Sequence, residues 1–393
     1  MNINIDVQSL CVPQNKVRGI PCYMKNLISA FLKHSKNDYT FSFFDYGKER
    51  GNRKYFYTNM GFEIRETSIF ENNNVDYRLM TKAIGDKDVS FFGGTKYADY
   101  FPYTKWDLLH LPCHLRIPPN LNENTVVTVH DILPIFNEKT LTYEVDANQI
   151  FNNSMEFLRD NNIRVIAISE YTKEKLIEYY NVDEKKIEVV YNGFDNESFY
   201  NETNKEMLET YNLSGRYLLY LGAIQRRKDM YSVLKAYEIV KEKKQNNDLK
   251  MVFAGDKCKQ TDDFYKLVRD SKYSEDIVLT GYVTDEERRW LMSSAEVFVF
   301  PSLAEGFGLP IIEAMACETP VITTNQTSMP EVGGDAALYV PPRRPDLIAD
   351  YIISLLENES LRLGCIKKGI KQKEKFSWER CSRETEDIYK KMK

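Results

Sequence analysis

The 393-residue chain contains few of the side chains that form disulfides or metal sites. Its seven cysteines are an odd number and are scattered without a C-x-x-C pair. This pattern argues against a disulfide framework and against a zinc ribbon. Only four histidines are present. We therefore expect the cysteines to be reduced thiols.

Long apolar runs and a strong excess of one charge are also missing. No run approaches the roughly 20 apolar residues that cross a bilayer, and the first residues, MNINIDVQSL, lack the basic and apolar parts of a secretion signal. The formal net charge is −5, which does not favour nucleic-acid binding. We expect a cytoplasmic protein with no nucleic-acid partner, and peripheral contact with the inner face of a membrane is a further expectation.

The hydrophobic content of 42% is enough for two domain cores in a chain of this length. Short apolar runs such as INIDV, TVVTV and RVIAIS alternate with longer amphipathic stretches, a pattern typical of βαβ units and a mainly parallel sheet. The pattern begins again at RYLLYL. We predict an α/β protein with a first domain at 1–195, a linker at 196–213, a second domain at 214–376 and a terminal helix at 377–393.

The segment PSLAEGFGLPIIEAMA, which starts at Pro301, carries the strongest local signal. A buried strand precedes it, Glu305 lies in the following loop, and Glu313 falls about one turn into an apolar helix. Ligands bind at this edge of open α/β sheets, where helix N-termini present free N–H groups. A buried carboxylate needs a donor, and a ribose diol supplies two hydroxyls. For the spacing alone, a helix-dipole acid and a solvated loop residue are the ordinary interpretation.

Three further positions gain meaning only in combination. Arg226, Arg227 and Lys228 directly follow a strand and precede a helix-like run, where cations bind a diphosphate. His130 ends an apolar strand of the first half, and Gly19 opens a helix. Each of these, taken alone, is more often a solvated or structural residue.

Two other patterns resemble metal sites. Asp86 and Asp88 form a D-x-D sequence, but nothing that would bind phosphate flanks them, so we interpret them as a solvated loop. His110, Cys113 and His114 have the residue types of a zinc site, but an irregular strand end is the simpler interpretation. We expect no metal.

In combination and in this order, several motifs resemble the retaining GT-B glycosyltransferases of family GT4. They are RGIPCYMKNLISAF, VTVHDILP, VIAISEYTKEKLIEYY, LGAIQRRKDM, VFAGD, LTGYVTDEERRW, AEGFGLPIIEAMA and MPEVGGDAALYVPP. The resemblance covers nearly the whole chain, except for about Tyr39 to Tyr103, where no motif is recognised. It implies two Rossmann-like domains facing a central cleft, with a C-terminal helix from about Trp378 that crosses back to the N-terminal domain.

The resemblance also implies roles for the donor-binding residues. Glu313 matches the acid that binds the nucleotide ribose, and Glu305 matches the acid that contacts the donor sugar. Phe307, Gly308 and Leu309 match a loop whose backbone amides meet sugar and phosphate.

Arg227 and Lys228 match the pair that neutralises the diphosphate. His130 matches the histidine near the transferred sugar, and Gly19 matches the glycine loop near phosphate and acceptor. This N-terminal loop is thin in glycine here. Two more matches complete the donor set: Tyr282 and Val283 line the base, and Gly222 follows the first strand of the second domain. Many relatives have an arginine soon after that glycine, where this chain has Ala223.

The resemblance implies a retaining, metal-independent hexosyltransferase without a cofactor, using a nucleotide-diphosphate sugar as donor. The expected acceptor is a saccharide or lipid-linked saccharide in O-antigen-like or capsule-like polysaccharide synthesis. A sugar-nucleotide 2-epimerase of the same architecture and a non-catalytic sugar-nucleotide-binding protein remain alternatives.

Overall fold

The computed structural model describes residues 1–10, 19–44, 60, 62–63, 70–72, 75–82, 88–94, 106–114, 117, 121, 123–132, 145–244, 248–258 and 260–392. The chain divides into two compact units. The first contains Met1–Ile135, Tyr143–Gly193 and Trp378–Lys393, and the second is formed mainly by Phe194–Ser377. Each unit is an α/β structure built on its own sheet, which confirms the predicted fold class.

The first unit has a mixed sheet with the strand order β10-β9-β8-β7-β1-β2-β6-β5-β3, and β4 pairs with β5. The strands are β1 (Asn2–Asp6), β2 (Asp38–Phe44), β3 (Phe62–Glu63), β4 (Phe70–Asn72), β5 (Val75–Lys82), β6 (Asp88–Gly94), β7 (Leu108–Leu111), β8 (Thr125–Val129), β9 (Arg164–Ala167) and β10 (Ile187–Val189). Its helices are α1 (Ile20–His34), α3 (Val145–Asp160), α4 (Glu170–Tyr180) and α13 (Trp378–Lys391), with short 3-10 turns at Gln8–Leu10 and Glu184–Lys186.

From β10 to β6 all neighbouring strands are parallel. Strand β5 instead runs antiparallel to β6, β3 and β4. The prediction of a mainly parallel sheet therefore holds for the part of this unit that carries recognised motifs. The antiparallel strands lie in the stretch where the sequence shows no motif.

Strand β8 is buried on both faces. Every residue of β8 is buried, as expected for a central parallel strand covered by helices. Val126 belongs to a core with Leu27 and Ile28 of α1. Val127 belongs to a separate core with Phe151 and other residues of α3 and α4.

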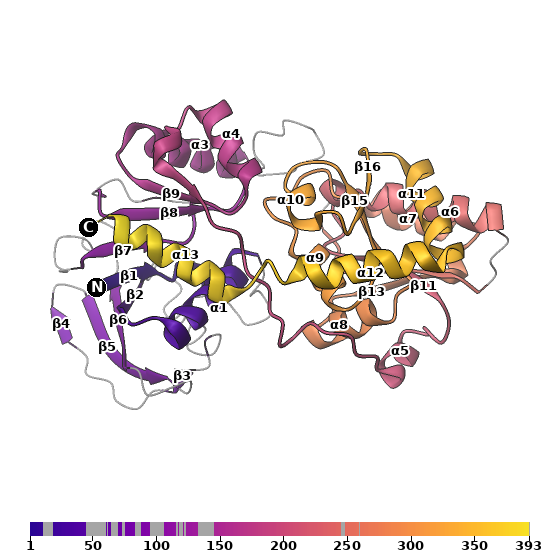
Figure 1. Cartoon of the computed structure of the whole chain (residues 1–393), viewed down its shortest axis with the longest axis horizontal. Helices are drawn as coiled ribbons and strands as arrows, with labels where there is room; N and C mark the ends of the chain where they lie inside the picture. Colours follow the sequence, from indigo (N-terminus) through magenta and orange to yellow (C-terminus); the bar gives the residue numbers. More distant parts are fainter. Residues whose placement is uncertain are drawn as a thin grey trace. The chain divides into compact units, whose positions relative to one another are not determined.

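The C-terminal helix α13 packs on the first unit. It contacts α1, and its buried Ile388 and Tyr389 belong to the same core as α1 and β1 (Figure 1). The Glu386 carboxylate accepts hydrogen bonds from Asn37 Nδ2 at 2.7 Å and from the Tyr39 hydroxyl at 2.8 Å. These contacts confirm that the last helix returns to the N-terminal part of the fold.

The second unit has a fully parallel sheet with the order β13-β12-β11-β14-β15-β16. Its strands are β11 (Tyr217–Leu221), β12 (Lys250–Ala254), β13 (Ile277–Gly281), β14 (Val297–Phe300), β15 (Val321–Thr324) and β16 (Leu338–Val340). Its helices are α5 (Lys205–Thr210), α6 (Met230–Lys244), α7 (Asp262–Asp270), α8 (Asp285–Ser293), α9 (Leu309–Ala316), α10 (Met329–Gly333), α11 (Pro345–Glu357) and α12 (Glu359–Lys373), with 3-10 turns at Arg226–Lys228 and Ser274–Asp276.

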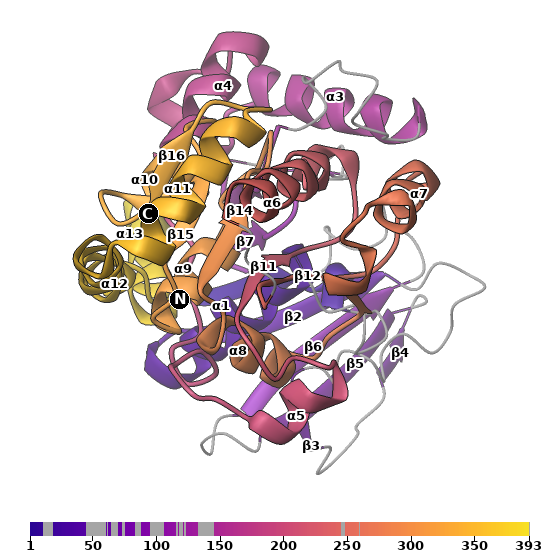
Figure 2. The same cartoon turned by 90° about the vertical axis from the view of Figure 1, so that its right-hand side faces the viewer.

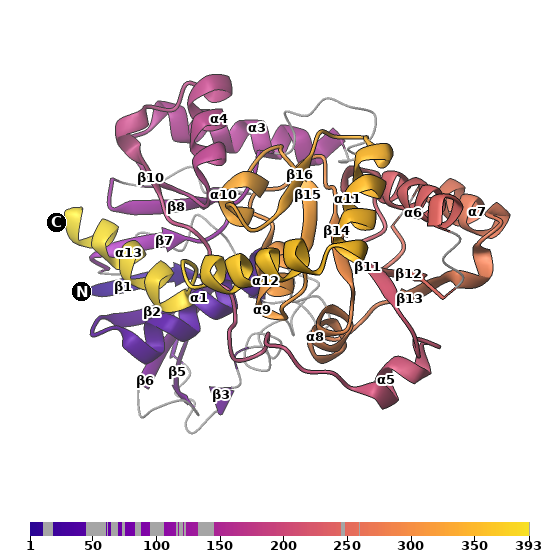
Figure 3. The same ribbon diagram turned by 45° about the vertical axis from the view of Figure 1, so that its right-hand side comes forward.

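Helices pack against this sheet and against each other. The pair α6 and α11 is in contact (Figure 2) and contributes Val233, Tyr237, Ile348 and Ile352 to one core. Helix α12 packs along α9 (Figure 3). Among the residues described, no helix combines the length and apolarity required to span a membrane.

The segment 196–213, for which the sequence predicts a linker, lies within the second unit. It contains α5, whose N-cap Asn204 accepts a hydrogen bond from the backbone N–H of Met207. Leu208 and Leu213 are buried, and α5 contacts α8. Because the segment is mostly polar, its sequence does not indicate that two of its leucines anchor it to the second unit.

Candidate active site

A glycine with positive φ directly follows β11 and β12, and another is the last residue of β13. These are Gly222 (φ 151°), Gly255 (φ 150°) and Gly281 (φ 70°). A Cβ atom on Gly255 would lie 2.0 Å from the carbonyl oxygen of Gly222, so only glycine allows this approach. Gly222 is among the residues predicted from the sequence, whereas Gly255 and Gly281 are not, although the repeated glycines in LGA, AGD and TGY are a visible signal.

Three cations follow Gly222 in the 3-10 turn Arg226–Lys228. Arg226 turns outward: its Nη2 lies 2.6 Å from Asp263 Oδ2, and its guanidinium stacks over the Tyr231 ring. Arg227 and Lys228 turn instead toward the loop after β14. The structure therefore separates one member of the cation run from the other two.

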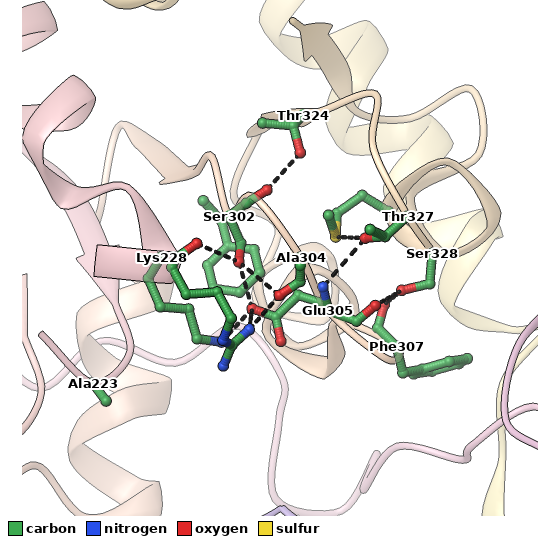
Figure 4. A network of polar contacts seen from close by, with 12 residues as sticks. Ala223, Lys228, Ser302, Ala304, Glu305, Phe307, Thr324, Thr327 and Ser328 are labelled. Atoms are coloured by element: carbon green, nitrogen blue, oxygen red, sulfur yellow. Dashed lines mark hydrogen bonds and ion pairs between the residues drawn. The ribbon is translucent and has the colours of Figure 1, made fainter. Parts of the chain in front are cut away.

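Glu305 is the meeting point of these two cations. Its Oε1 lies 2.9 Å from Arg227 Nη1, forms an ion pair with Lys228 Nζ, and accepts a 2.6 Å hydrogen bond from Ser302 Oγ (Figure 4). The three charged side chains are only 11–13% exposed. Lys228 Nζ also lies 4.9 Å from the Phe300 ring centroid. Two cations thus share the carboxylate of Glu305.

The pKa values of this cluster follow from burial and charge. Burial alone raises the pKa of Glu305, but Arg227 and Lys228 outweigh it and bring the pKa to about 2. Burial lowers the pKa of Lys228, and Glu305 opposes that shift. Glu305 is therefore ionised at neutral pH, and the ammonium of Lys228 depends on a nearby negative charge.

The loop that carries Glu305 is held by hydroxyl groups. The Glu305 backbone N–H donates to Thr327 Oγ1 at 3.2 Å, and Ser328 Oγ donates to the Phe307 carbonyl at 2.8 Å. The Phe307 ring is buried edge-on against Phe376. Gly308 (φ 106°) is the N-cap of α9, which begins at Leu309. The side chain of Phe307 thus anchors the loop, and Gly308 sets its turn into the helix.

Glu313 lies in α9 and is 7% exposed. Its Oε2 forms an ion pair with Nη2 of Arg288, which comes from α8. Burial raises the pKa of Glu313, and Arg288 opposes this shift. The sequence predicts that this buried carboxylate needs a donor but does not identify Arg288. The only local sequence signal for Arg288 is its D-x-x-R spacing from Asp285. In the structure, Arg288 Nη1 lies 2.8 Å from Asp285 Oδ1.

Tyr282 and Val283 follow β13. Tyr282 is 45% exposed, whereas Val283 is buried. Of these two residues, Tyr282 therefore presents a ring at the surface, and Val283 belongs to the interior.

In the first unit, His130 follows β8 and is buried in a T-shaped contact with Tyr23, with the two ring centroids 4.6 Å apart. Its Nε2 lies 2.7 Å from the Pro112 carbonyl, which can only accept, so Nε2 carries the proton. Burial lowers the pKa of His130 to about 4. A neutral ring with Nδ1 as the acceptor follows. Gly19 is the N-cap of α1, with φ 59°.

The other histidines of this unit form no metal-binding group with Cys113. His110 Nε2 contacts Thr128 Oγ1 at 2.8 Å, and its Nδ1 contacts the Tyr389 hydroxyl at 2.6 Å. His114 Nδ1 accepts a hydrogen bond from the His130 backbone N–H. No group of three or more potential metal-ligating residues occurs in the described part of the chain. Asp86 and the side chain of Asp88 lie outside the described residues.

Comparison with known proteins identifies the class of this fold. Anabaena HepE in complex with UDP is similar over 100% of both chains, with a TM-score of 0.71 at 14% identity. The chain also matches the family models described as glycosyl transferases group 1 over residues 206–372 and glycosyltransferase family 4 over residues 95–198. The two-unit α/β fold is therefore that of the GT-B glycosyltransferases.

Sequence relatives identify the family. O-antigen chain mannosyltransferase B of Escherichia coli is 30% identical over 279 residues, which cover 69% of this chain and 71% of the relative. Serotype-specific mannosyltransferase WbdA of E. coli is 27% identical over 266 residues, but the match spans about a third of that protein, 32%. The chain belongs to glycosyltransferase family 4. These relatives favour a transferase over an epimerase.

Proposed function

We propose that this glycosyltransferase moves a sugar from a nucleoside-diphosphate sugar to a saccharide or lipid-linked saccharide acceptor during O-antigen-like or capsule-like polysaccharide synthesis. The names of the two E. coli relatives support mannose as the transferred sugar. The UDP complex of HepE supports a nucleotide donor. Peripheral contact with the cytoplasmic face of a membrane is part of the proposal, since a lipid-linked acceptor resides there.

The observation that carries this proposal is the pairing of Arg227 and Lys228 with one carboxylate. Both cations are nearly buried, and both are paired with Glu305. Two neighbouring cations in one nearly buried cluster suit a ligand that carries more than one negative charge, such as a diphosphate. The cluster also follows Gly222 at the carboxyl end of β11, where ligands bind in open α/β sheets.

The remaining donor residues are assigned around this diphosphate. Glu313 binds the ribose hydroxyls. Glu305 contacts the donor sugar while it holds the two cations. We assign the nucleotide base to Tyr282 and Val283, and we assign sugar and phosphate contacts to the backbone at Phe307, Gly308 and Leu309.

The reaction depends on the nucleoside diphosphate, which is a good leaving group. The bond from the anomeric carbon to the diphosphate oxygen breaks, and its electron pair goes to that oxygen. Arg227 and Lys228 stabilise the charge that develops there. The acceptor hydroxyl forms the new bond on the same face of the sugar and passes its proton to the departing phosphate, so configuration is retained. The fixed cations make a divalent metal unnecessary in this proposal.

The first unit contributes His130 and Gly19. His130 is neutral with its proton on Nε2, so Nδ1 has a lone pair for a sugar hydroxyl. Gly19 presents the N-terminus of α1, where backbone N–H groups favour an anion.

A thermal-shift panel of nucleoside-diphosphate sugars tests this function. Because ligand binding stabilises the folded state by mass action, the true donor should raise the melting temperature of the wild-type protein. Lys228→Ala should reduce that shift for the same donor. A panel in which no nucleotide sugar stabilises the wild-type protein contradicts the proposal.

A further inference from the structure

Arg288 is the partner of Glu313, and its surroundings hold it in one position. Helices α8 and α9, which carry the two residues, contact each other (Figure 1). Arg288 Nη2 pairs with Glu313 Oε2, and Nη1 lies 2.8 Å from Asp285 Oδ1. The guanidinium carbon lies 5.1 Å from the ring centroid of Phe199. One carboxylate on each side and an aromatic ring therefore fix the plane of the guanidinium.

The neighbouring arginine has a different orientation. Arg289 Nη2 lies 2.6 Å from Glu202 Oε2, and Nη1 lies 3.2 Å from the Ser198 carbonyl. Its side chain is about as buried as that of Arg288, 11% against 17% exposed. Two adjacent arginines on one helix thus serve separate partners, and only Arg288 reaches Glu313.

Glu313 depends on this contact to accept hydrogen bonds. Burial and the nearby carboxylates of Asp285 and Asp195 raise its pKa, and Arg288 acts in the opposite direction. Glu313 in turn raises the pKa of Cys317, the C-cap of α9. Without Arg288, burial and the carboxylates of Asp285 and Asp195 remain, and all three favour the protonated form of Glu313. A protonated carboxyl group loses one acceptor oxygen and a fixed orientation.

We propose that Arg288 is a positioning residue for the nucleotide: it fixes the Glu313 carboxylate through Oε2, so that the other oxygen accepts hydrogen bonds from the ribose hydroxyls. This inference rests on the ribose-binding role proposed for Glu313. It adds a residue from α8 that acts through Glu313 and makes no direct contact with the reacting atoms.

The test compares ribonucleotides with nucleotides that lack the hydroxyls. Calorimetry gives dissociation constants for GDP and UDP and for their 2′,3′-dideoxy counterparts, and the base that wild type prefers is then used throughout. Wild type should prefer the ribonucleotide. Arg288→Leu should reduce that preference by about tenfold, the effect of one charge-assisted hydrogen bond, and leave dideoxynucleotide binding nearly unchanged. Unchanged dideoxynucleotide binding also shows that the variant is folded.

Two further variants sharpen the comparison. Arg288→Lys keeps the charge and should restore part of the preference, whereas the matched control Arg289→Leu should keep all of it. In Arg288→Leu the remaining ribonucleotide affinity should also fall with decreasing pH at a higher pH than in wild type, because Glu313 protonates more easily.

The outcomes separate this inference from the proposed function. If Arg288→Leu weakens ribonucleotide and dideoxynucleotide equally, its role is purely structural and the inference is wrong. If Glu313→Gln abolishes the preference while Arg288→Leu preserves it, the ribose site stands and only the role of Arg288 falls. If wild type shows no preference for the ribonucleotide, both the ribose assignment and this inference are overturned.

Discussion

The carboxylate of Glu305 determines how the two neighbouring cations can act. It stays ionised even at a pH far below neutral, because Arg227 and Lys228 lower its pKa more than burial raises it. Lys228 in turn has a lowered pKa, and burial is the main reason. A phosphate that gains charge during bond breaking would favour the ammonium form more strongly than the intact donor does. Such an interaction, stronger in the transition state, accelerates the chemical step.

Lys228→Ala should therefore lower kcat by about 100-fold, the usual cost of removing one donor to a developing anion. Arg226→Ala is the matched control from the same turn, and it should leave kcat nearly unchanged because Arg226 pairs with Asp263. Steady-state kinetics and melting temperatures of both variants check this. Retained activity in Lys228→Ala, or a loss explained by unfolding, contradicts the phosphate role.

Three buried histidines predict a pH dependence of stability in the first unit. Burial lowers the pKa of His110 to about 3 and those of His114 and His130 to about 4. The neutral histidines contribute their full share to the free energy of unfolding above their pKa in the unfolded chain, about 6.5. This contribution is lost as the pH falls toward their pKa values in the folded protein. Urea unfolding at pH 5 should therefore show a loss of about 1–2 kcal/mol per histidine relative to pH 7.5.

Tryptophan fluorescence follows this transition, since two of the three tryptophans, Trp106 and Trp378, lie in the first unit. His114→Gln should reduce the pH dependence. His34→Gln is the control, because His34 is exposed at the end of α1. This variant should leave the pH dependence of stability unchanged. Equal pH dependence in both variants contradicts the assignment.

The sequence could predict part of this site and not the rest. Arg227, Lys228 and Glu305 all lie next to strand ends, and parallel strands bring those ends to one edge. Their placement was therefore accessible from the order of elements. Arg288 was not, because its contact with Glu313 depends on which faces of α8 and α9 meet. Hydrophobic periodicity does not determine such a contact between two polar side chains.

Of the glycines whose surroundings the structure describes, Gly255, directly after β12, leaves the least room for a side chain. Gly255→Ala would place Cβ 2.0 Å from the Gly222 carbonyl, at a φ of 150°. We expect a loss of about 3 kcal/mol or more in the free energy of unfolding. Gly364→Ala is the control: this glycine lies in α12, and an added Cβ would meet no atom within 4 Å beyond its own stretch of helix, so the variant should gain about 0.5–1 kcal/mol in the free energy of unfolding. Urea unfolding measures both, and equal stabilities contradict the packing argument.

The order of helices and parallel strands was predictable because each has its own hydrophobic period. The antiparallel pairing of β5 with β6 was not, since no motif marks that stretch. The bonds of Glu386 to Asn37 and Tyr39 join residues almost 350 positions apart. Local pattern holds no information about such a distant contact, although the resemblance to the family implies the returning helix.

For the whole molecule, α13 links the end of the chain to the beginning. It supplies Cys381, Ile388 and Tyr389 to the core that contains α1 and β1. The residues proposed to bind the donor, Arg227, Lys228, Glu305 and Glu313, lie in the second unit, and His130 and Gly19 lie in the first. We therefore expect catalysis to require both units and nucleotide binding to depend mainly on the second.

Deletion of Trp378–Lys393 should accordingly reduce turnover much more than nucleoside-diphosphate affinity. Calorimetry and a turnover assay on the same preparation compare the two quantities. Lys390→Ala is the control within this helix, since its exposed side chain pairs with Asp387, and it should retain both properties. A truncated protein that stays folded and fully active shows that α13 is not needed for catalysis.

The most direct measurement is NMR of the product formed from an α-linked nucleoside-diphosphate mannose and a saccharide acceptor in the presence of EDTA. We predict one nucleoside diphosphate released for each new α-glycosidic bond, at a rate that EDTA does not change. Arg227 and Lys228 would then supply the positive charge at the leaving phosphate. A β-linked product, or activity that EDTA abolishes and a divalent metal restores, would contradict the proposed mechanism.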